Sequence, residues 1–128
     1  MAVRSQMPLL QHVLLNLVMN AIEQITEIRP AEGGQVRIRV SRAVTGKGEG
    51  GRASQEVIRI QVEDNGPGIH WRLWEKIFDA GFTTRKDGSG LGLFISRNIV
   101  ESLGGRIYVA ESYINFGTVF SVDLPYQI

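Results

Sequence analysis

The stretch GSGLGL, from Gly88 to Leu93, sets three glycines at alternate positions directly before an apolar helical pattern. Its spacing differs from the dinucleotide fingerprint G-x-G-x-x-G, and it lacks the lysine that ends a P-loop. Unhindered backbone N–H groups that lead into a helix N-terminus nevertheless favour an anion. The stretch therefore predicts a phosphate site of a general kind.

Two basic residues stand just upstream of these glycines, in the segment DAGFTTRKDGSG (residues 79–90), which shows no clear periodicity. Arg85 and Lys86 have little to bury there, so they can swing onto a terminal phosphate when a loop closes. We therefore expect this segment to act as a lid.

Working outward, the pattern that follows the glycines predicts a helix over residues 91–103, ended by Gly104 and Gly105. An earlier amphipathic pattern predicts a helix from Pro8 to Ile28, with Pro8 in its first turn. Its apolar residues are Leu10, Val13, Leu14, Leu17, Val18, Ala21, Ile22, Ile25 and Ile28. A short helical piece is expected around residues 71–78.

Four stretches alternate or are rich in apolar residues as strands are: residues 35–40, 56–64, 106–112 and 117–124. In the first of them, Val36, Ile38 and Val40 predict one buried face. The order of helix, two strands, glycine loops, helix and two strands predicts an α+β fold. We expect a two-layer α/β sandwich in which helices cover one face of a largely antiparallel sheet.

Composition limits the classes of function. A chain of 128 residues is one domain, residues 1–128. The net charge of +1 gives no general field for nucleic acid or an anionic membrane, and the absence of cysteine excludes disulfides and thiolate metal sites. The longest apolar stretch, residues 9–22, is broken by polar residues, so we expect no insertion of this segment into a membrane.

Asn16 and Asn20 lie four residues apart on the first predicted helix, so they project from the same side. One interpretation makes them exposed polar positions. However, asparagine is a poor residue for a helix interior. A carboxamide oxygen is also a hard, neutral ligand that suits Mg²⁺, which keeps waters and bridges phosphates. The pair is therefore a candidate to hold the metal of a nucleotide.

The stretch DNGPGI (residues 64–69) follows directly after a predicted strand. Asn-Gly and Pro-Gly are ordinary turn dipeptides, so a plain turn is one interpretation. It does not explain an aspartate at the inner end of an apolar strand. The Asp64 carboxylate could accept a hydrogen bond from an exocyclic amine such as that of adenine, and Gly66 and Gly68 would let a flat base approach.

Taken together and in this order, the motifs resemble those of the catalytic, ATP-binding domain of sensor histidine kinases. These kinases belong to a superfamily with gyrase B, Hsp90 and MutL. The stretch NLVMNA (16–21) is similar to the N box, DNGPGI to the G1 box, IFDAGFTT (77–84) to the F box and GSGLGL to the G2 box. The final GTVFSVDLP (117–125) is similar to the closing strand of the family.

The resemblance implies an ATP site with a mixed sheet of about five strands on three helices. Asn20 would coordinate Mg²⁺, Asp64 and Thr118 would contact adenine, and Phe78 and Phe82 would anchor the lid. The catalytic residues implied are Asn16, Asn20 and Arg85. The nucleotide-binding set implied is Asn16, Asn20, Asp64, Gly66, Gly68, Ile69, Phe82, Thr83, Thr84, Arg85, Lys86, Gly88, Ser89, Gly90, Leu91, Gly92 and Thr118.

Three departures from the family pattern carry predictions. ATPase relatives have a glutamate as general base where this chain has Asn16, and an amide cannot take a proton from water at neutral pH. We therefore expect little hydrolysis and transfer to an external nucleophile instead. Arg85 stands where a lysine is common. The first strand of the family domain is cut down to AVRS (residues 2–5), which predicts a ragged sheet edge.

The phosphate acceptor is expected outside this chain. Its two histidines, His12 and His70, lack the flanking residues of the family's H box. The resemblance then implies a separate histidine-bearing dimerisation domain, a downstream response regulator and a cytoplasmic location, alone or in a membrane-bound sensor. The isolated chain should bind ATP without phosphorylating itself. Trp71 and Trp74 are assigned to local packing, with contact to the acceptor helices as the alternative.

Two other functions stay open. The first is a protein serine kinase similar to anti-sigma factors, which share this fold. The second is a module that uses ATP only as a conformational ligand. Labelled serine, or ATP binding without transfer, would distinguish them from a histidine kinase.

Overall fold

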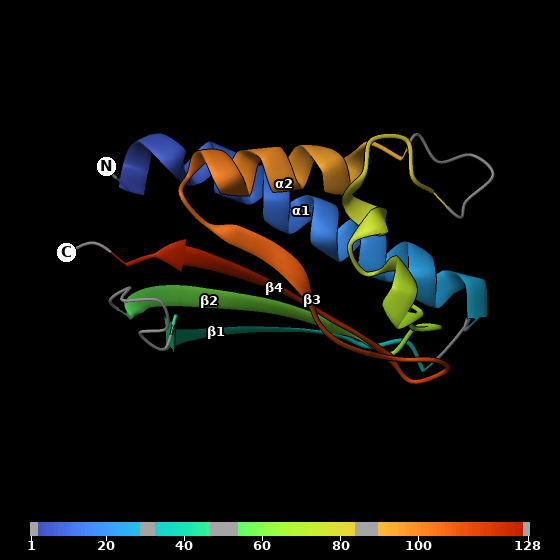
Figure 1. Ribbon diagram of the computed structural model, residues 1–128. Coiled ribbons are helices and arrows are strands. Elements are labelled where there is room, and N and C mark those ends of the chain that lie inside the picture. Colours follow the sequence, from blue (N-terminus) through green and yellow to red (C-terminus); the bar gives the residue numbers. More distant parts are fainter. Residues whose placement is uncertain (1–2, 29–32, 47–53, 84–89, 127–128) are drawn as a thin grey trace.

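The computed structural model describes residues 3–28, 33–46, 54–83 and 90–126. Two helices lie on one face of a four-stranded sheet (Figure 1). The helices are α1 (Val3–Ile28) and α2 (Gly92–Ser102), and the strands are β1 (Val36–Thr45), β2 (Gln55–Asp64), β3 (Arg106–Tyr113) and β4 (Gly117–Pro125). Two 3-10 turns, η2 (Trp71–Leu73) and η3 (Lys76–Phe78), connect β2 towards α2. The predicted two-layer α+β fold is confirmed.

The sheet has the order β1-β2-β4-β3, and every neighbouring pair in it is antiparallel. The described residues thus form four strands, not a mixed sheet of about five, and two α-helices with two short turns, not three helices. The remnant strand expected at residues 2–5 is wrong for residues 3–5, because these continue α1.

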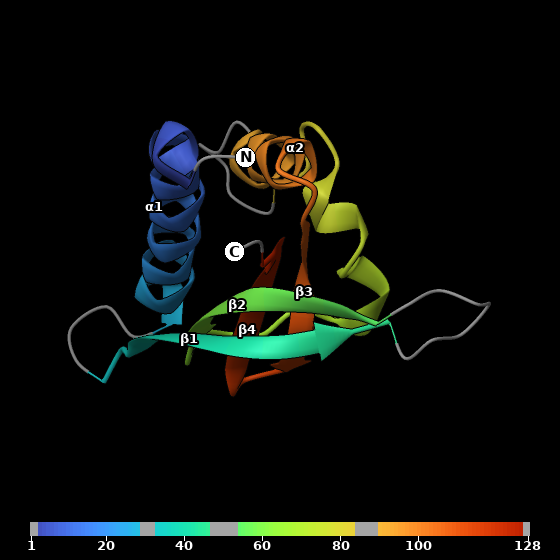
Figure 2. The same cartoon turned by 90° about the vertical axis from the view of Figure 1, so that its left-hand side faces the viewer.

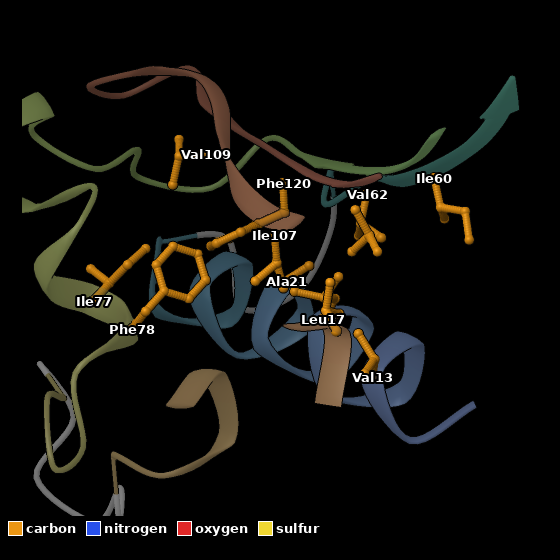
Figure 3. Close-up of a cluster of buried hydrophobic side chains, with 12 residues drawn as sticks. Val13, Leu17, Ala21, Ile60, Val62, Ile77, Phe78, Ile107, Val109 and Phe120 are labelled. Atoms are coloured by element: carbon orange, nitrogen blue, oxygen red, sulfur yellow. The ribbon is translucent and has the colours of Figure 1, made fainter. Parts of the chain in front are cut away.

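The core lies between the helices and the two central strands. Figure 3 shows Val13, Leu17 and Ala21 of α1 pointing towards strand residues that include Val62 and Phe120. Phe78 meets Phe120 edge to face, with ring centroids 6.2 Å apart. The apolar stripe read from residues 8–28 therefore packs as predicted along its centre, whereas Ile22 and Ile28, at its margin and end, stay exposed.

The predicted ends of α2 are close to the observed ones, whereas the predicted start of α1 is not. Helix α2 begins at Gly92 and ends at Ser102, one residue inside the predicted range on each side. The left-handed φ of 79° at Gly104 closes it, as glycine after a helix commonly does. In contrast, α1 begins at Val3, so Pro8 lies inside the helix and not in its first turn.

The prediction of a buried face on the first strand is wrong. Ile38 and Val40 are 53% and 68% exposed, although they pair with Val62 and Ile60, which face the helices. β1 is an edge strand, and the buried strand residues of the core cluster come from β2, β3 and β4. Alternation in the sequence showed which face would be apolar, but the position of the helices decides how much of it is covered.

Candidate functional site

A hollow of about 460 Å³ opens between α1, α2 and the loop that follows β2. In Figure 2, α1 stands on one side of this region and the η2 and η3 turns on the other. The described residues that line it are Asn16, Met19, Asn20, Glu23, Gln24, Gly68, Ile69, His70, Leu73, Ile77, Phe82, Thr83, Gly90, Gly92, Leu93 and Phe120. Eight of the sequence-predicted site residues are thus brought together.

One wall of the hollow is a single face of α1. Besides the two asparagines, it includes Glu23 and Gln24, at seven and eight residues after Asn16. Positions i, i+4, i+7 and i+8 share a helix face, so the helical period could have extended the prediction to them. Met19 also lines the hollow, which gives this wall an apolar element next to Asn20.

The two asparagines differ in their contacts. Asn16 Nδ2 donates to Ser96 Oγ at 3.2 Å and to the Gly92 carbonyl oxygen at 3.4 Å, so it joins α1 to the first turn of α2. Within the described part of the chain, the Asn20 carboxamide makes no comparable bond, and Asn20 lines the same hollow. Both are half-buried, so the interpretation as exposed polar positions does not hold.

At the end of β2, the side chain of Asp64 is almost wholly buried. Its Oδ1 accepts a hydrogen bond from the Gly66 backbone N–H at 2.8 Å. Burial raises the pKa of this carboxyl, and the backbone N–H groups of Gly66 and Thr118 offset only part of that effect. No Lys or Arg side chain among the described residues is a partner, so the group keeps unused capacity to accept hydrogen bonds.

The glycines of the DNGPGI turn stand where side chains would collide. A Cβ at residue 66 would lie 2.9 Å from Asp64 Oδ1 and 3.3 Å from Cβ of Gln24, which lines the hollow. Gly68 has a left-handed φ of 81°, and a Cβ there would collide with the backbone of Tyr113. The turn therefore requires glycine for two reasons, close approach and conformation.

A serine that the sequence did not single out ties this turn to the last two strands. Ser112 Oγ accepts from the Ile69 backbone N–H at 2.7 Å and lies 2.8 Å from Thr118 Oγ1. The Asn115 backbone N–H also donates to the Pro67 carbonyl at 2.7 Å. The bonds from Ile69 to Ser112 and from Asn115 to Pro67 join residues more than 40 positions apart, so no local pattern could have revealed Ser112.

The structure does not bring every predicted residue into the larger hollow. Asp64 and Thr118 border a smaller hollow of about 220 Å³, together with Glu63 and Val119. Strand alternation nevertheless puts the Asp64 and Thr118 side chains on the helix-facing side, with Val62 and Phe120. We follow this alternation, because a Cβ at residue 66 would lie within 3.3 Å of both Asp64 and Gln24, and Gln24 lines the larger hollow.

The start of α2 closes the other end of the hollow. Gly90 has a left-handed φ of 72°, and its carbonyl accepts from the Gly81 N–H at 3.0 Å. This hydrogen bond connects the turn at Phe82 and Thr83 to Gly90, which precedes α2. Leu91 is exposed directly before the helix. The predicted residues Thr84, Arg85, Lys86, Gly88 and Ser89 lie outside the described residues.

The aromatic residues after the glycine turn have separate environments. Trp74 packs against the core and donates its Nε1–H to the Ile69 carbonyl at 2.9 Å, so the prediction of local packing is confirmed for it. Trp71 is 66% exposed and stacks with His70, whose Nδ1 accepts from the Arg72 N–H. The ring of Trp71 thus contacts its chain neighbours His70 and Arg72 and lies outside the core. His12 is exposed on α1.

Residues 6–128 match the family described as histidine kinase-, DNA gyrase B-, and HSP90-like ATPase. The chain belongs to this family. It is 38% identical over 115 residues to the C4-dicarboxylate transport sensor protein DctB of Rhizobium meliloti, covering 90% of the chain and 16% of DctB. It is 39% identical over 118 residues to the sensory histidine kinase/phosphatase NtrB of Salmonella typhimurium, covering 91% of the chain and 31% of NtrB.

Solved structures agree. The nucleotide-free catalytic domain of histidine kinase ThkA matches with a TM-score of 0.69 and 38% identity, over 92% of this chain and 66% of that one. The mycobacterial sensor histidine kinase MprB matches with a TM-score of 0.71 and 26% identity, over 92% and 70%. The predicted family is confirmed, and the domain is a catalytic ATPase domain of the type found in two-component sensor histidine kinases.

The match covers less than a third of the curated relatives' own length. Among the described helices, none is both long enough and apolar enough to cross a membrane.

Proposed function

We propose that this domain binds Mg-ATP in the larger hollow and donates the γ-phosphate to a histidine on a separate dimerisation domain. The phosphohistidine would serve a response regulator, and the whole would act in the cytoplasm, alone or as part of a membrane-bound sensor. The observation that carries the proposal is the hollow itself. It joins the two asparagines of α1, the glycine turn after β2 and the start of α2, which lie far apart in the sequence.

The glycine turn supports an adenine site. Asp64 is a buried acceptor whose hydrogen-bond partners among the described residues are backbone N–H groups, so an exocyclic amine would supply a missing donor. A Cβ at residue 66 would lie 2.9 Å from Asp64 Oδ1, so glycine at this position keeps the acceptor unobstructed. Thr118, held by Ser112, is directly opposite Asp64 across the strands and would hold a water beside the base.

The opposite end of the hollow fits a polyphosphate with its metal. The first N–H groups of α2 have no partner within their own helix and favour negative charge. The carboxamide oxygens of Asn20 and Asn16 are hard ligands suited to Mg²⁺, which would neutralise phosphate charge when bound. Gly90, Leu91 and Gly92 lead into this helix start. We assign lid closure to Thr84, Arg85, Lys86, Gly88 and Ser89.

Transfer rather than hydrolysis follows from the side chains present. Asn16 cannot act as a general base towards water, and its Nδ2 is occupied by α2. In the transfer, an imidazole nitrogen of the acceptor attacks the γ-phosphorus, and the bond from phosphorus to the ADP oxygen breaks. The domain's task is positioning and charge neutralisation.

The test uses radiolabelled ATP, Mg²⁺, the domain and a histidine-bearing dimerisation domain. We expect label on the dimerisation domain that is labile in acid and stable in base, and none on this chain alone. Label on serine, or binding of ATP without transfer to any acceptor, would contradict the proposal.

Replacing Asn20 by alanine should abolish most of the transfer, because it removes the proposed metal ligand. Asn98 is a matched control, since it is exposed on α2 and does not line the hollow. Asn98→Ala should transfer at the normal rate. An Asn20→Ala protein that does the same would overturn the assignment of the metal ligand.

A further inference from the structure

Ser96 is a fully buried hydroxyl on α2, one helical turn after Gly92, and nothing in the sequence motifs assigns it a role. It is 0% exposed, and its Oγ lies 3.2 Å from Asn16 Nδ2 across the boundary between α2 and α1. Burying a hydroxyl costs free energy unless it has a hydrogen-bond partner, and the Asn16 amide is such a partner for Ser96. The hydrogen-bond partner of Ser96 is therefore Asn16, a residue that we place at the nucleotide.

The second contact of Asn16 fixes which way round its carboxamide lies. Nδ2 faces the Gly92 carbonyl oxygen at 3.4 Å, and a carbonyl oxygen can only accept a hydrogen bond. The group opposite must therefore be the NH₂ and not the oxygen. With its two hydrogens directed at Gly92 and Ser96, the amide nitrogen is used up on α2. Oδ1 is the polar atom of Asn16 that remains for a ligand in the hollow.

We propose that Ser96 is a positioning residue, which holds Asn16 so that it presents its oxygen, and not its NH₂, to the metal. This inference rests on the proposed function and refines it. The bond to Ser96 is the shorter of the two, so its loss leaves a single weak contact to Gly92. The carboxamide can then rotate and turn its NH₂ towards the cation. An N–H group cannot bind Mg²⁺, which takes oxygen ligands.

The contact also couples two parts of the site. Asn16 sits on α1, whereas Gly92 begins α2 and Ser96 lies one turn further along that helix. A metal ligand on α1 is thereby oriented by the helix whose N-terminus would face the phosphates. In this arrangement Asn16 and Asn20 are not equivalent, because Asn20 is not held in this way by the described residues.

The experiment measures ATP affinity by calorimetry with Mg²⁺ and, separately, with EDTA. The variants are Ser96→Ala and its matched control Ser102→Ala, a hydroxyl on the same helix that bonds only to the Ile99 carbonyl in the described structure. We expect Ser96→Ala to weaken Mg-ATP binding by about tenfold, close to the free energy of one net hydrogen bond. Binding in EDTA should stay within about twofold of the wild type, and Ser102→Ala should match the wild type in both conditions.

A second readout needs no nucleotide. In ¹⁵N spectra of the free domain, the side-chain NH₂ protons of Asn16 should exchange with water faster in Ser96→Ala than in Ser102→Ala. If the alanine variant does not fold, Ser96→Cys serves instead, because a thiol fills a similar space but is a weak acceptor. It should show the same selective loss.

The outcomes separate the two claims. If the wild type itself shows no Mg²⁺-dependent binding of ATP, the proposed function fails. If the wild type does and Ser96→Ala equals Ser102→Ala, the positioning role is overturned. A loss of equal size in Mg²⁺ and in EDTA would also overturn it, since that result indicates only a packing role.

Discussion

Asp64 on β2 and Asp123 on β4 are equally buried, each 5% exposed, yet their surroundings differ. Asp123 accepts two hydrogen bonds from Arg59, at 2.8 and 3.0 Å, and one from the Tyr108 hydroxyl at 2.8 Å. Burial alone would raise the pKa of its carboxyl, but the hydrogen bonds from Arg59 and Tyr108 and the charge of Arg59 together hold it below the ordinary value.

Asp64 receives no such cation. Burial is the largest effect on the pKa of this carboxyl and raises it, and only backbone N–H groups oppose the rise. The two residues show that burial by itself does not decide the state of a carboxylate, because the partner does. A buried carboxylate with a fitted cation is held in its ionised form, whereas one without it costs stability and is left to receive a ligand.

The largest expected effect is on stability at Asp123. Asp123→Asn removes the charge that pairs with Arg59, and we expect the free energy of unfolding to fall by about 2–3 kcal/mol, somewhat below the cost for a fully buried pair. The side chain of Arg59 is 28% exposed, which limits the loss. Urea unfolding measures it. ATP affinity of the folded protein should change by less than about twofold, and a large drop would break the contrast between the two sites.

Next in size is the effect of Asp64→Asn on binding. We expect ATP affinity to fall roughly 10- to 100-fold, because a charged acceptor for the adenine amine becomes a neutral one. The carboxamide oxygen can still accept from the Gly66 N–H, so the fold should not be weaker than the wild type at pH 7. Calorimetry with ATP and urea unfolding give the two numbers. Loss of stability together with normal ATP affinity would reverse the assigned roles.

The smallest effects are on pH dependence, and they have opposite signs. The folded pKa of Asp123 is lowered, so its contribution is present above the ordinary value of 3.8 and is lost as the pH falls below it. The folded pKa of Asp64 is raised, so the wild type loses stability as the pH rises from 3.8 through that higher value. Over this pH range, the free energy of unfolding of Asp64→Asn should therefore rise relative to that of the wild type. Urea unfolding from pH 3 to 7 tests both signs, and parallel profiles for the two variants would show that the carboxylates do not differ.

The elements with a strong local signal were predicted well. The helix at residues 92–102 and the four strands follow from apolar periodicity and glycine punctuation. The predictions fail where the burial of a strand depends on which helices cover it, or where a segment forms a strand only if it pairs with a neighbour. Ile38 and Val40 alternate like buried residues but lie on an edge strand, and residues 3–5 join a helix instead of forming a strand.

The same division holds for the site. Asn16, Asn20 and Gly68 were recognisable because helix spacing and turn chemistry mark them locally, and the structure places all three around one hollow. Ser96 and Ser112 carry no local mark, since each acts through a partner more than 40 residues away. Nor does any local pattern show that Asp123 pairs with a cation whereas Asp64 does not.

By itself, the sequence determined the family, the order of the elements and the residues with candidate chemistry, because periodicity, turn glycines and motif order are local properties of a chain. Only the tertiary structure decided how these residues are used. The antiparallel register sets Arg59 beside Asp123 and leaves Asp64 against the glycine turn. The packing of α2 on α1 turns the NH₂ of Asn16 towards Ser96. Hydrogen bonds and burial depend on distances across the fold, which no stretch of the chain specifies alone.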